Sequence, residues 1–304
     1  MGSVIALRWV LYFDLGLLFG LPLFLLYAVG DDRHYDRHAL TGLALLAATG
    51  LAMSALAFVF QAAVMTGVPV RQFGDVPFGV LLRQTAFGTA LVVRGAALLA
   101  VLFCATFYSR ARRTTIWGAM LAGAVALATL AWSGHGAAGE GAAGWVQLIA
   151  DILHLLAAAA WLAAIAAFLF VLFGTVSGSP GGLSLARHAL AKFSIIGTVL
   201  VGVLIVTGFA NAMFLVGFAQ MITLGGSLYG RLLLAKLILF GGMVALASLN
   251  RYRLVPSLVC AEGQETERAI GHLRKSLLLE GSLALLILAL VAWLGTLSPP
   301  ILRG

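Results

Sequence analysis

The sequence predicts an all-α integral membrane protein, built as a bundle of eight transmembrane helices. Its 304 residues are 62% hydrophobic and only 10% charged, whereas soluble proteins carry about 25% charged residues. Apolar runs long enough to cross a bilayer also recur along the whole chain. These two observations exclude a disordered chain and a soluble two-domain enzyme.

Eight apolar runs define the expected helices, because a span needs about 20 residues at 1.5 Å of rise per residue. The shortest run is 116–133, and the rest meet this length comfortably. No soluble domain is expected outside the bundle, so residues 1–304 are interpreted as one polytopic membrane domain. The expected helices cover residues 10–29, 40–64, 80–108, 116–133, 145–173, 189–219, 232–249 and 277–297.

The basic residues predict the orientation. Short loops on the cytoplasmic side are enriched in Lys and Arg. If the N-terminus is outside, twelve of the nineteen Lys and Arg residues fall in inner segments and five in outer segments. We therefore expect both termini on the outer side, which is periplasmic for a bacterial inner membrane. The basic residues are scattered and form no stripe, so we expect a bilayer and no nucleic acid as the partner.

Ionisable residues inside the expected helices are costly in lipid and indicate function or a structural pair. Asp14, Arg94 and Lys236 are interpreted as supporting intramembrane charges, together with the carboxylate of Asp151. Counting along the helices, Asp14, Asp151 and Lys236 each lie about 10 Å below the outer surface. We expect opposite charges at this depth to neutralise one another.

The run 145–173 carries one polar face, formed by Gln147, Asp151, His154 and Trp161 at spacings that place them on one side of a helix. Its other sides are apolar, so this face must look into protein or water. We expect Gln147 and Trp161 to line a cavity that opens to the outer side. For Asp151, pairing with Lys236 or Arg94 is the alternative to a ligand role.

Three further residues lie near the outer ends of the expected helices. His135 follows the fourth helix, Glu140 lies in the next loop as a cavity-lining candidate, and Met65 ends the second helix. Imidazole and thioether groups are ligands for copper, and carboxylate suits its harder oxidation state, Cu²⁺. The candidate metal ligands are therefore His135, His154, Asp151 and Met65. Rim packing is the alternative for Met65.

Several stretches of the chain form a recognisable set. They are Trp132-Ser133-Gly134-His135, the Asp-x-x-His-Leu-Leu-Ala-Ala-x-x-Trp run from Asp151 to Trp161, Lys192-Phe193-Ser194, the segment from Tyr229 to Lys236 and the segment from Asn250 to Pro256. Together these stretches resemble the copper-resistance D (CopD) family of bacterial inner-membrane proteins. The resemblance implies an eight-helix inner-membrane protein of copper resistance and copper homeostasis. It also implies a separate periplasmic copper-binding partner of the CopC type, since no such domain is fused here.

Three functions remain open from the sequence. The first is uptake or translocation of copper, as Cu⁺ or Cu²⁺, through the outer cavity. The second is a copper receptor or assembly factor that docks a periplasmic carrier without transport. The third is a haem-binding electron-transfer protein, which needs two axial ligands where only His154 lies well inside a helix. The sequence has no serine elbow, phosphate loop or HExxH motif, so we expect no enzymatic activity.

Overall fold

The computed structural model describes most of the chain. The described residues are 2–29, 36–67, 78–107, 112–132, 141–176, 182–217 and 224–298. Within these ranges the structure is helical, and eight helices are long and apolar enough to cross a membrane. This confirms the all-α class and the eight expected spans.

Most of the helices are longer than the apolar runs that predict them, because their polar ends are helical too. The C-terminal helix starts at Gln264 rather than at residue 277, since its first turns are rich in Glu, Arg and Lys, which are good helix formers. The bounds are α1 Gly2–Phe24 with the π-helical turn η1 Leu25–Val29, α2 Asp36–Thr66, α3 Phe78–Gln84, α4 Ala86–Phe107, α5 Arg112–Trp132, α6 Gly141–Val176, α7 Gly182–Leu215, η5 Leu224–Gly226, α9 Leu228–Leu249 with η6 Asn250–Leu254 and α10 Val255–Cys260, and α11 Gln264–Leu294.

The run 80–108, expected as one helix, is divided into α3 and α4. Thr85 lies at the break, and its hydroxyl accepts a hydrogen bond of 2.9 Å from the backbone N–H of Gly88. This is an N-cap, which begins a new helix. Gly88 packs so close to the carbonyls of Leu81 and Leu82 that a Cβ atom would collide with them. Hydropathy does not register such a cap, so the expected single helix is wrong at this point.

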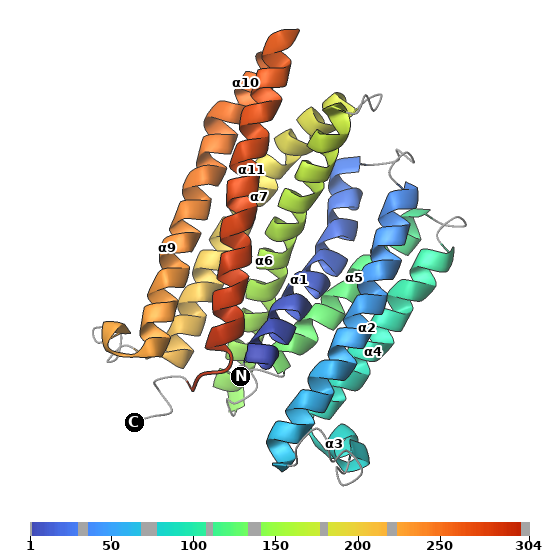
Figure 1. The fold of residues 1–304 in the computed structure, drawn as a ribbon, viewed down its shortest axis with the longest axis vertical. Helices are drawn as coiled ribbons and strands as arrows, with labels where there is room; N and C mark the ends of the chain where they lie inside the picture. Colours follow the sequence, from blue (N-terminus) through green and yellow to red (C-terminus); the bar gives the residue numbers. More distant parts are fainter. Residues whose placement is uncertain are drawn as a thin grey trace.

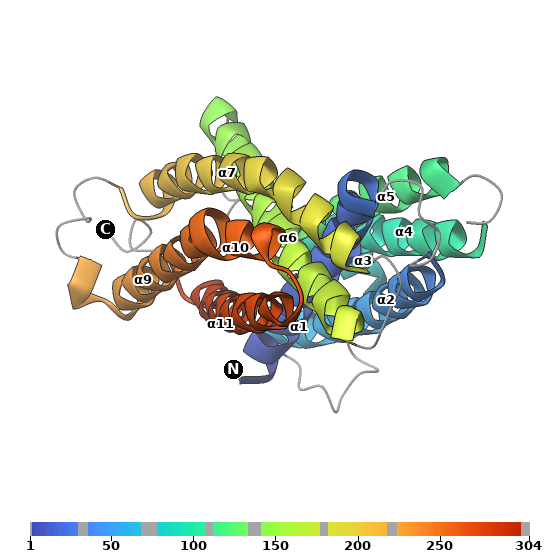
Figure 2. The same cartoon turned by 90° about the horizontal axis from the view of Figure 1, so that it is seen from above.

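The bundle has two sides joined by α1 and α6. Viewed from above, α2, α4 and α5 lie on one side, and α7, α9 and α11 lie on the other (Figure 2). The long, tilted α6 contacts α1, α5, α7 and α11 (Figure 1). Gly16 and Gly20 of α1 lie against Ala159 and Ala163 of α6. Small residues at this contact let the two helices approach closely, as is common in membranes.

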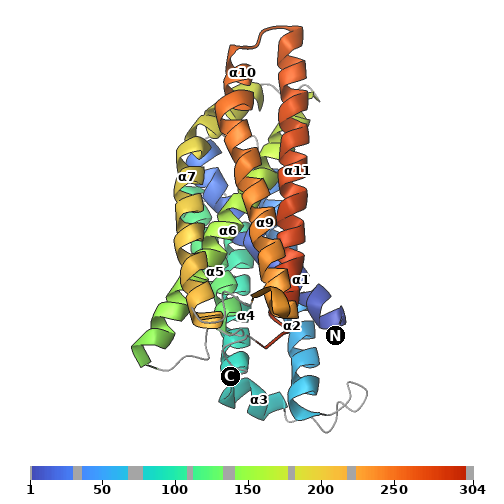
Figure 3. The ribbon, with the colours of Figure 1, turned by 90° about the vertical axis from the view of Figure 1, so that its left-hand side faces the viewer.

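The first and last spans meet at one end of the molecule. The start of α1 and the end of α11 lie side by side in Figures 1 and 3. The Trp9 indole N–H of α1 donates a 3.1 Å hydrogen bond to the backbone carbonyl of Leu285 in α11. Both chain ends therefore leave the bundle on the same side, as eight crossings require. That this side is the outer one remains a prediction.

Candidate functional site

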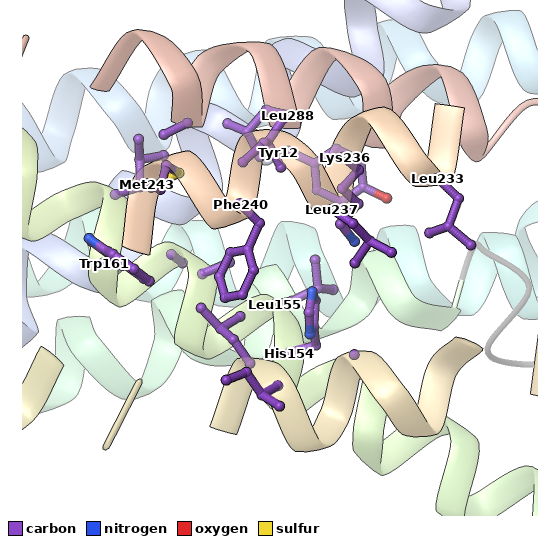
Figure 4. A pocket seen from close by; sticks show the side chains of 18 of the residues that line it. Tyr12, His154, Leu155, Trp161, Leu233, Lys236, Leu237, Phe240, Met243 and Leu288 are labelled. Atoms are coloured by element: carbon purple, nitrogen blue, oxygen red, sulfur yellow. The ribbon is translucent and has the colours of Figure 1, made fainter. Parts of the chain in front are cut away.

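A cavity of about 580 Å³ lies between α6, α7, α9 and α11, with Tyr12 of α1 at one edge (Figure 4). Its walls are mostly Leu, Ile, Phe and Ala side chains. Five residues interrupt this apolar wall with a polar or sulfur atom: Tyr12, His154, Trp161, Lys236 and Met243. Two of the predicted polar-face residues, His154 and Trp161, thus line one cavity, as does the predicted intramembrane charge Lys236.

The His154 ring is held by α7. Its Nδ1 atom lies 2.9 Å from the hydroxyl oxygen of Thr207, and that hydroxyl donates a 2.6 Å hydrogen bond to the carbonyl of Val203. Because the single hydroxyl proton goes to Val203, we assign a proton to Nδ1, which donates to Thr207. The Nε2 atom then keeps its lone pair, the form in which imidazole binds a metal.

Asp151 lies one turn before His154, and its carboxylate has a hydrogen-bond partner other than Thr207. Its Oδ1 accepts a 3.0 Å hydrogen bond from the Asn211 side-chain amide of α7, and its charge attracts that of Lys236 on α9. Asp151 is not among the residues that line the cavity. These contacts agree with the alternative in which Asp151 partners Lys236. Gln147, two turns before His154, is buried and also does not line the cavity.

The other two predicted charges lie on the opposite side of the bundle. Arg94 of α4 is 3% exposed and donates a 2.7 Å hydrogen bond from Nε to the Thr129 hydroxyl of α5. Asp14 of α1 is equally buried and lies against Gly50 of α2. Neither residue lines the large cavity. The predicted intramembrane charges therefore lie on both sides of the bundle, and only Asp151 and Lys236 are near one another.

The rim candidates are less well defined. Met65 is 52% exposed at the end of α2, and the cavity walls come from other helices. His135 and Glu140 lie outside the described residues. Among the residues that are described, no three His, Cys, Asp or Glu side chains come together as a metal cluster. The ligand set of His135, His154, Asp151 and Met65 remains a prediction, and in the structure only His154 of these lines the cavity.

Two further residues lie in or beside the site: Met243 was not a sequence-based candidate, and Glu280 was noted in the sequence only as an intramembrane carboxylate nearer the cytoplasmic side. Met243 is a buried thioether on the cavity wall, and its spacing of four and three with Lys236 and Phe240 marks one face of α9. Glu280 of α11 is 2% exposed and accepts a 2.6 Å hydrogen bond from the Trp161 indole N–H. The periodicity could have indicated Met243, but a contact between helices could not be read from either helix alone.

Comparison with known proteins identifies the family. Residues 2–145 match the family model described as "Copper resistance protein D-like, N-terminal domain", and residues 187–294 match "Copper resistance protein D". The chain is 39% identical to copper resistance protein D of Pseudomonas syringae pv. tomato over 305 residues, covering 99% of this chain and 98% of the relative. The chain belongs to the copper resistance protein D family.

A second relative agrees with the cellular location of the family. Inner membrane protein YebZ of Escherichia coli (strain K12) is 31% identical over 170 residues, which cover 56% of this chain and 55% of the relative. No solved structure matches the chain. With its eight apolar helices, this member of the copper resistance protein D family is a multi-pass inner-membrane protein that handles copper at the membrane. The second family model includes most of α7 and all of α9 and α11, which supply much of the cavity wall.

Proposed function

We propose that this protein acts as a carrier rather than as an enzyme, and that it moves copper ions inward across the inner membrane through the cavity between α6, α7, α9 and α11. One observation carries this proposal. An imidazole with a free nitrogen, on His154, and a thioether, on Met243, lie on the wall of the same cavity inside a copper-handling protein. Both groups are suitable copper ligands.

The arrangement of these two donors favours passage over storage. His154 lies at the level of Lys236 (Figure 4), and Met243 lies seven residues farther along α9, which is about 10 Å of helix. One ion cannot be held tightly by both groups at once. Conduction requires sites that bind well enough to admit an ion and weakly enough to release it. Two separate single donors meet this condition better than a closed chelate.

The direction of transport and the partner belong to the same proposal. With both termini outside, the start of α1 and the end of α11 mark the periplasmic end of the bundle. For His135, Glu140 and Met65 we keep the role expected from the sequence, which is to receive copper on the periplasmic side from a separate carrier of the CopC type. From the rim the ion passes to His154, with Asp151 and Lys236 setting the local charge, and then to Met243.

Copper uptake by proteoliposomes tests the proposal. Purified protein is reconstituted and supplied with Cu⁺ under a reductant or with Cu²⁺ in parallel. We expect His154→Ala and Met243→Leu each to lower the initial uptake rate by roughly tenfold or more, as loss of a metal-ligating group does. The matched controls are His272→Ala, which removes an exposed imidazole, and Met120→Leu, which alters a thioether buried in the other side of the bundle.

The possible results separate the three functions. Wild-type uptake that both site variants abolish supports the route. Unchanged uptake in both variants overturns the route. Copper binding without uptake by the wild type instead supports the receptor or assembly factor. A Soret absorption band in the purified protein supports the haem protein.

A further inference from the structure

A second cavity, of about 260 Å³, lies farther along the same four helices. We call it the inner cavity, and the 580 Å³ cavity the outer cavity. The inner cavity has a more polar wall than the outer one, because Ser194, Thr198, Asn250, Arg251 and Glu280 all contribute to it. The mechanism proposed above leaves this cavity and the buried carboxylate of Glu280 unused.

The two cavities follow one another along the bundle. From the outer to the inner cavity, the numbers of the lining residues rise in α6 and α9 and fall in α7 and α11. This is the order expected when neighbouring helices are antiparallel. The outer cavity uses residues 154–162 of α6, 204–216 of α7, 233–243 of α9 and 284–288 of α11, and the inner cavity uses 161–168, 190–201, 244–255 and 273–280. Of the described residues, Trp161 alone lines both cavities.

The Trp161 side chain is fixed in this shared position. It is 3% exposed, its indole N–H donates to Glu280 Oε1 at 2.6 Å, and its ring packs edge-on against Phe240 with centroids 6.2 Å apart. Figure 4 shows Trp161 at the end of the outer cavity nearest Met243. A buried, hydrogen-bonded indole is therefore the wall between the two spaces.

Glu280 is held by neutral donors. Its Oε2 accepts a 2.9 Å hydrogen bond from the Asn250 side-chain amide, and the Oδ1 atom of Asn250 is buried without a partner among the described residues. The nearby guanidinium of Arg251 is instead bound to α7, through the Ser194 carbonyl at 2.9 Å and the Thr198 hydroxyl. A carboxylate in the membrane interior without a paired charge attracts a cation strongly.

We propose that the outer and inner cavities are two chambers of one cation path, that Trp161 is the partition between them, and that its hydrogen bond to Glu280 keeps the partition closed. A cation that reaches the partition is drawn to the Glu280 carboxylate and competes with the indole N–H for Oε1. Losing this hydrogen bond frees the ring to turn. The ion then enters the inner chamber, where the Glu280 oxygens and the free Oδ1 of Asn250 receive it.

The identity of this cation as copper rests on the proposed function, but the partition itself does not. The test therefore measures whether a thiol reagent can reach each chamber, and it does not depend on copper transport. Single cysteines are placed in the outer chamber by Ala158→Cys and in the inner chamber by Ser194→Cys, in a background where Cys104→Ala and Cys260→Ser remove the native thiols. A charged, membrane-impermeant thiosulfonate reagent is applied to vesicles of either orientation.

With Trp161 intact, we expect each cysteine to react from one membrane face only, and the two cysteines to react from opposite faces. Trp161→Ala should let both react from both faces. Trp161→Phe keeps a ring but lacks the N–H, so it should give partial access and also guards against misfolding of the alanine variant. Glu280→Gln can still accept from the indole, so the labelling should stay one-sided while copper uptake falls.

Trp293→Ala is the matched control, because Trp293 is a 40% exposed indole on α11 outside both cavities. One-sided labelling that persists in folded Trp161→Ala and Trp161→Phe overturns the partition, and so does two-sided labelling of the wild type. Absence of copper uptake with the expected labelling pattern would refute the proposed function and leave the two chambers standing. The two failures are thus distinguishable.

Discussion

Lys236 of α9 lines the same cavity as His154 of α6, along the route proposed for a cation (Figure 4). A positive charge in this low-dielectric space opposes the entry of copper, and the Asp151 carboxylate attracts the same ammonium group. On the proposed route, Lys236 thus raises the barrier for an ion and weakens the binding of copper at His154. Lys236 is not a copper ligand in this proposal, but its charge sets how tightly His154 binds copper.

Replacing Lys236 tests this interpretation. We expect Lys236→Gln to tighten copper binding by roughly tenfold, because the variant removes a like charge from a space of low dielectric constant. Copper titration of the purified protein in detergent measures the change. Lys192→Gln is the control, because Lys192 is an exposed ammonium that binds the Tyr27 carbonyl. Weaker or unchanged binding in Lys236→Gln would contradict the role given to its charge.

Thr207 controls His154 through the hydrogen bond at Nδ1. Thr207→Val keeps the shape of the side chain but removes this acceptor, so the ring loses a contact that orients it at Nδ1. Loss of such a supporting contact to a metal-binding histidine costs about 10-fold to 100-fold in affinity. We expect copper affinity to fall within this range in the same titration. Thr106→Val, at an exposed hydroxyl bound only to its own helix, should bind copper normally.

At the scale of helices, the contact between α1 and α6 joins the two sides of the bundle. Gly20 allows this contact, since a Cβ atom there would lie 2.7 Å from the Ala159 carbonyl oxygen and would also overlap the Ala163 side chain. The obstacle is backbone, which cannot turn aside as a flexible side chain can. Tight packing at this position keeps α6 in register with α1, and α6 in turn carries His154 and Trp161 to the cavities.

Gly20→Ala should therefore destabilise the protein. Overpacking of this kind costs about 1–3 kcal/mol, and we expect the Tm in detergent to fall by roughly 5 °C. Gly95→Ala is the matched control in α4, where a Cβ atom meets nothing within 4 Å. Equal Tm values for the two variants would show that α1 and α6 do not need this close approach.

For the whole molecule, the even number of spans fixes the two chain ends to one side, and the basic residues predict that this side is periplasmic. A fusion of alkaline phosphatase after Gly304 should be enzymatically active, because this enzyme folds only outside the cytoplasm. Green fluorescent protein at the same position should be dark. A fluorescent fusion with an inactive phosphatase would reverse the orientation and, with it, the direction of the proposed transport.

The sequence alone determined the class of the protein and its eight spans. Lipid offers no hydrogen bonds to the backbone, so an apolar run of sufficient length must be a helix whatever its neighbours are. The polar face of α6 is equally local, because a spacing of four and three fixes the side of a helix. His154 and Trp161 could therefore be assigned to a cavity before any fold was known, and both line one.

Only the tertiary structure decided which polar groups meet. Depth in the membrane placed Asp14, Asp151 and Lys236 at the same level, yet the choice of neighbouring helices puts Asp14 against α2 and leaves Asp151 and Lys236 together. The Trp161 to Glu280 hydrogen bond joins residues 119 positions apart. Such contacts depend on how each helix is rotated and which helix lies beside it. Packing of many small residues sets both, and no single helix encodes that packing in its own periodicity.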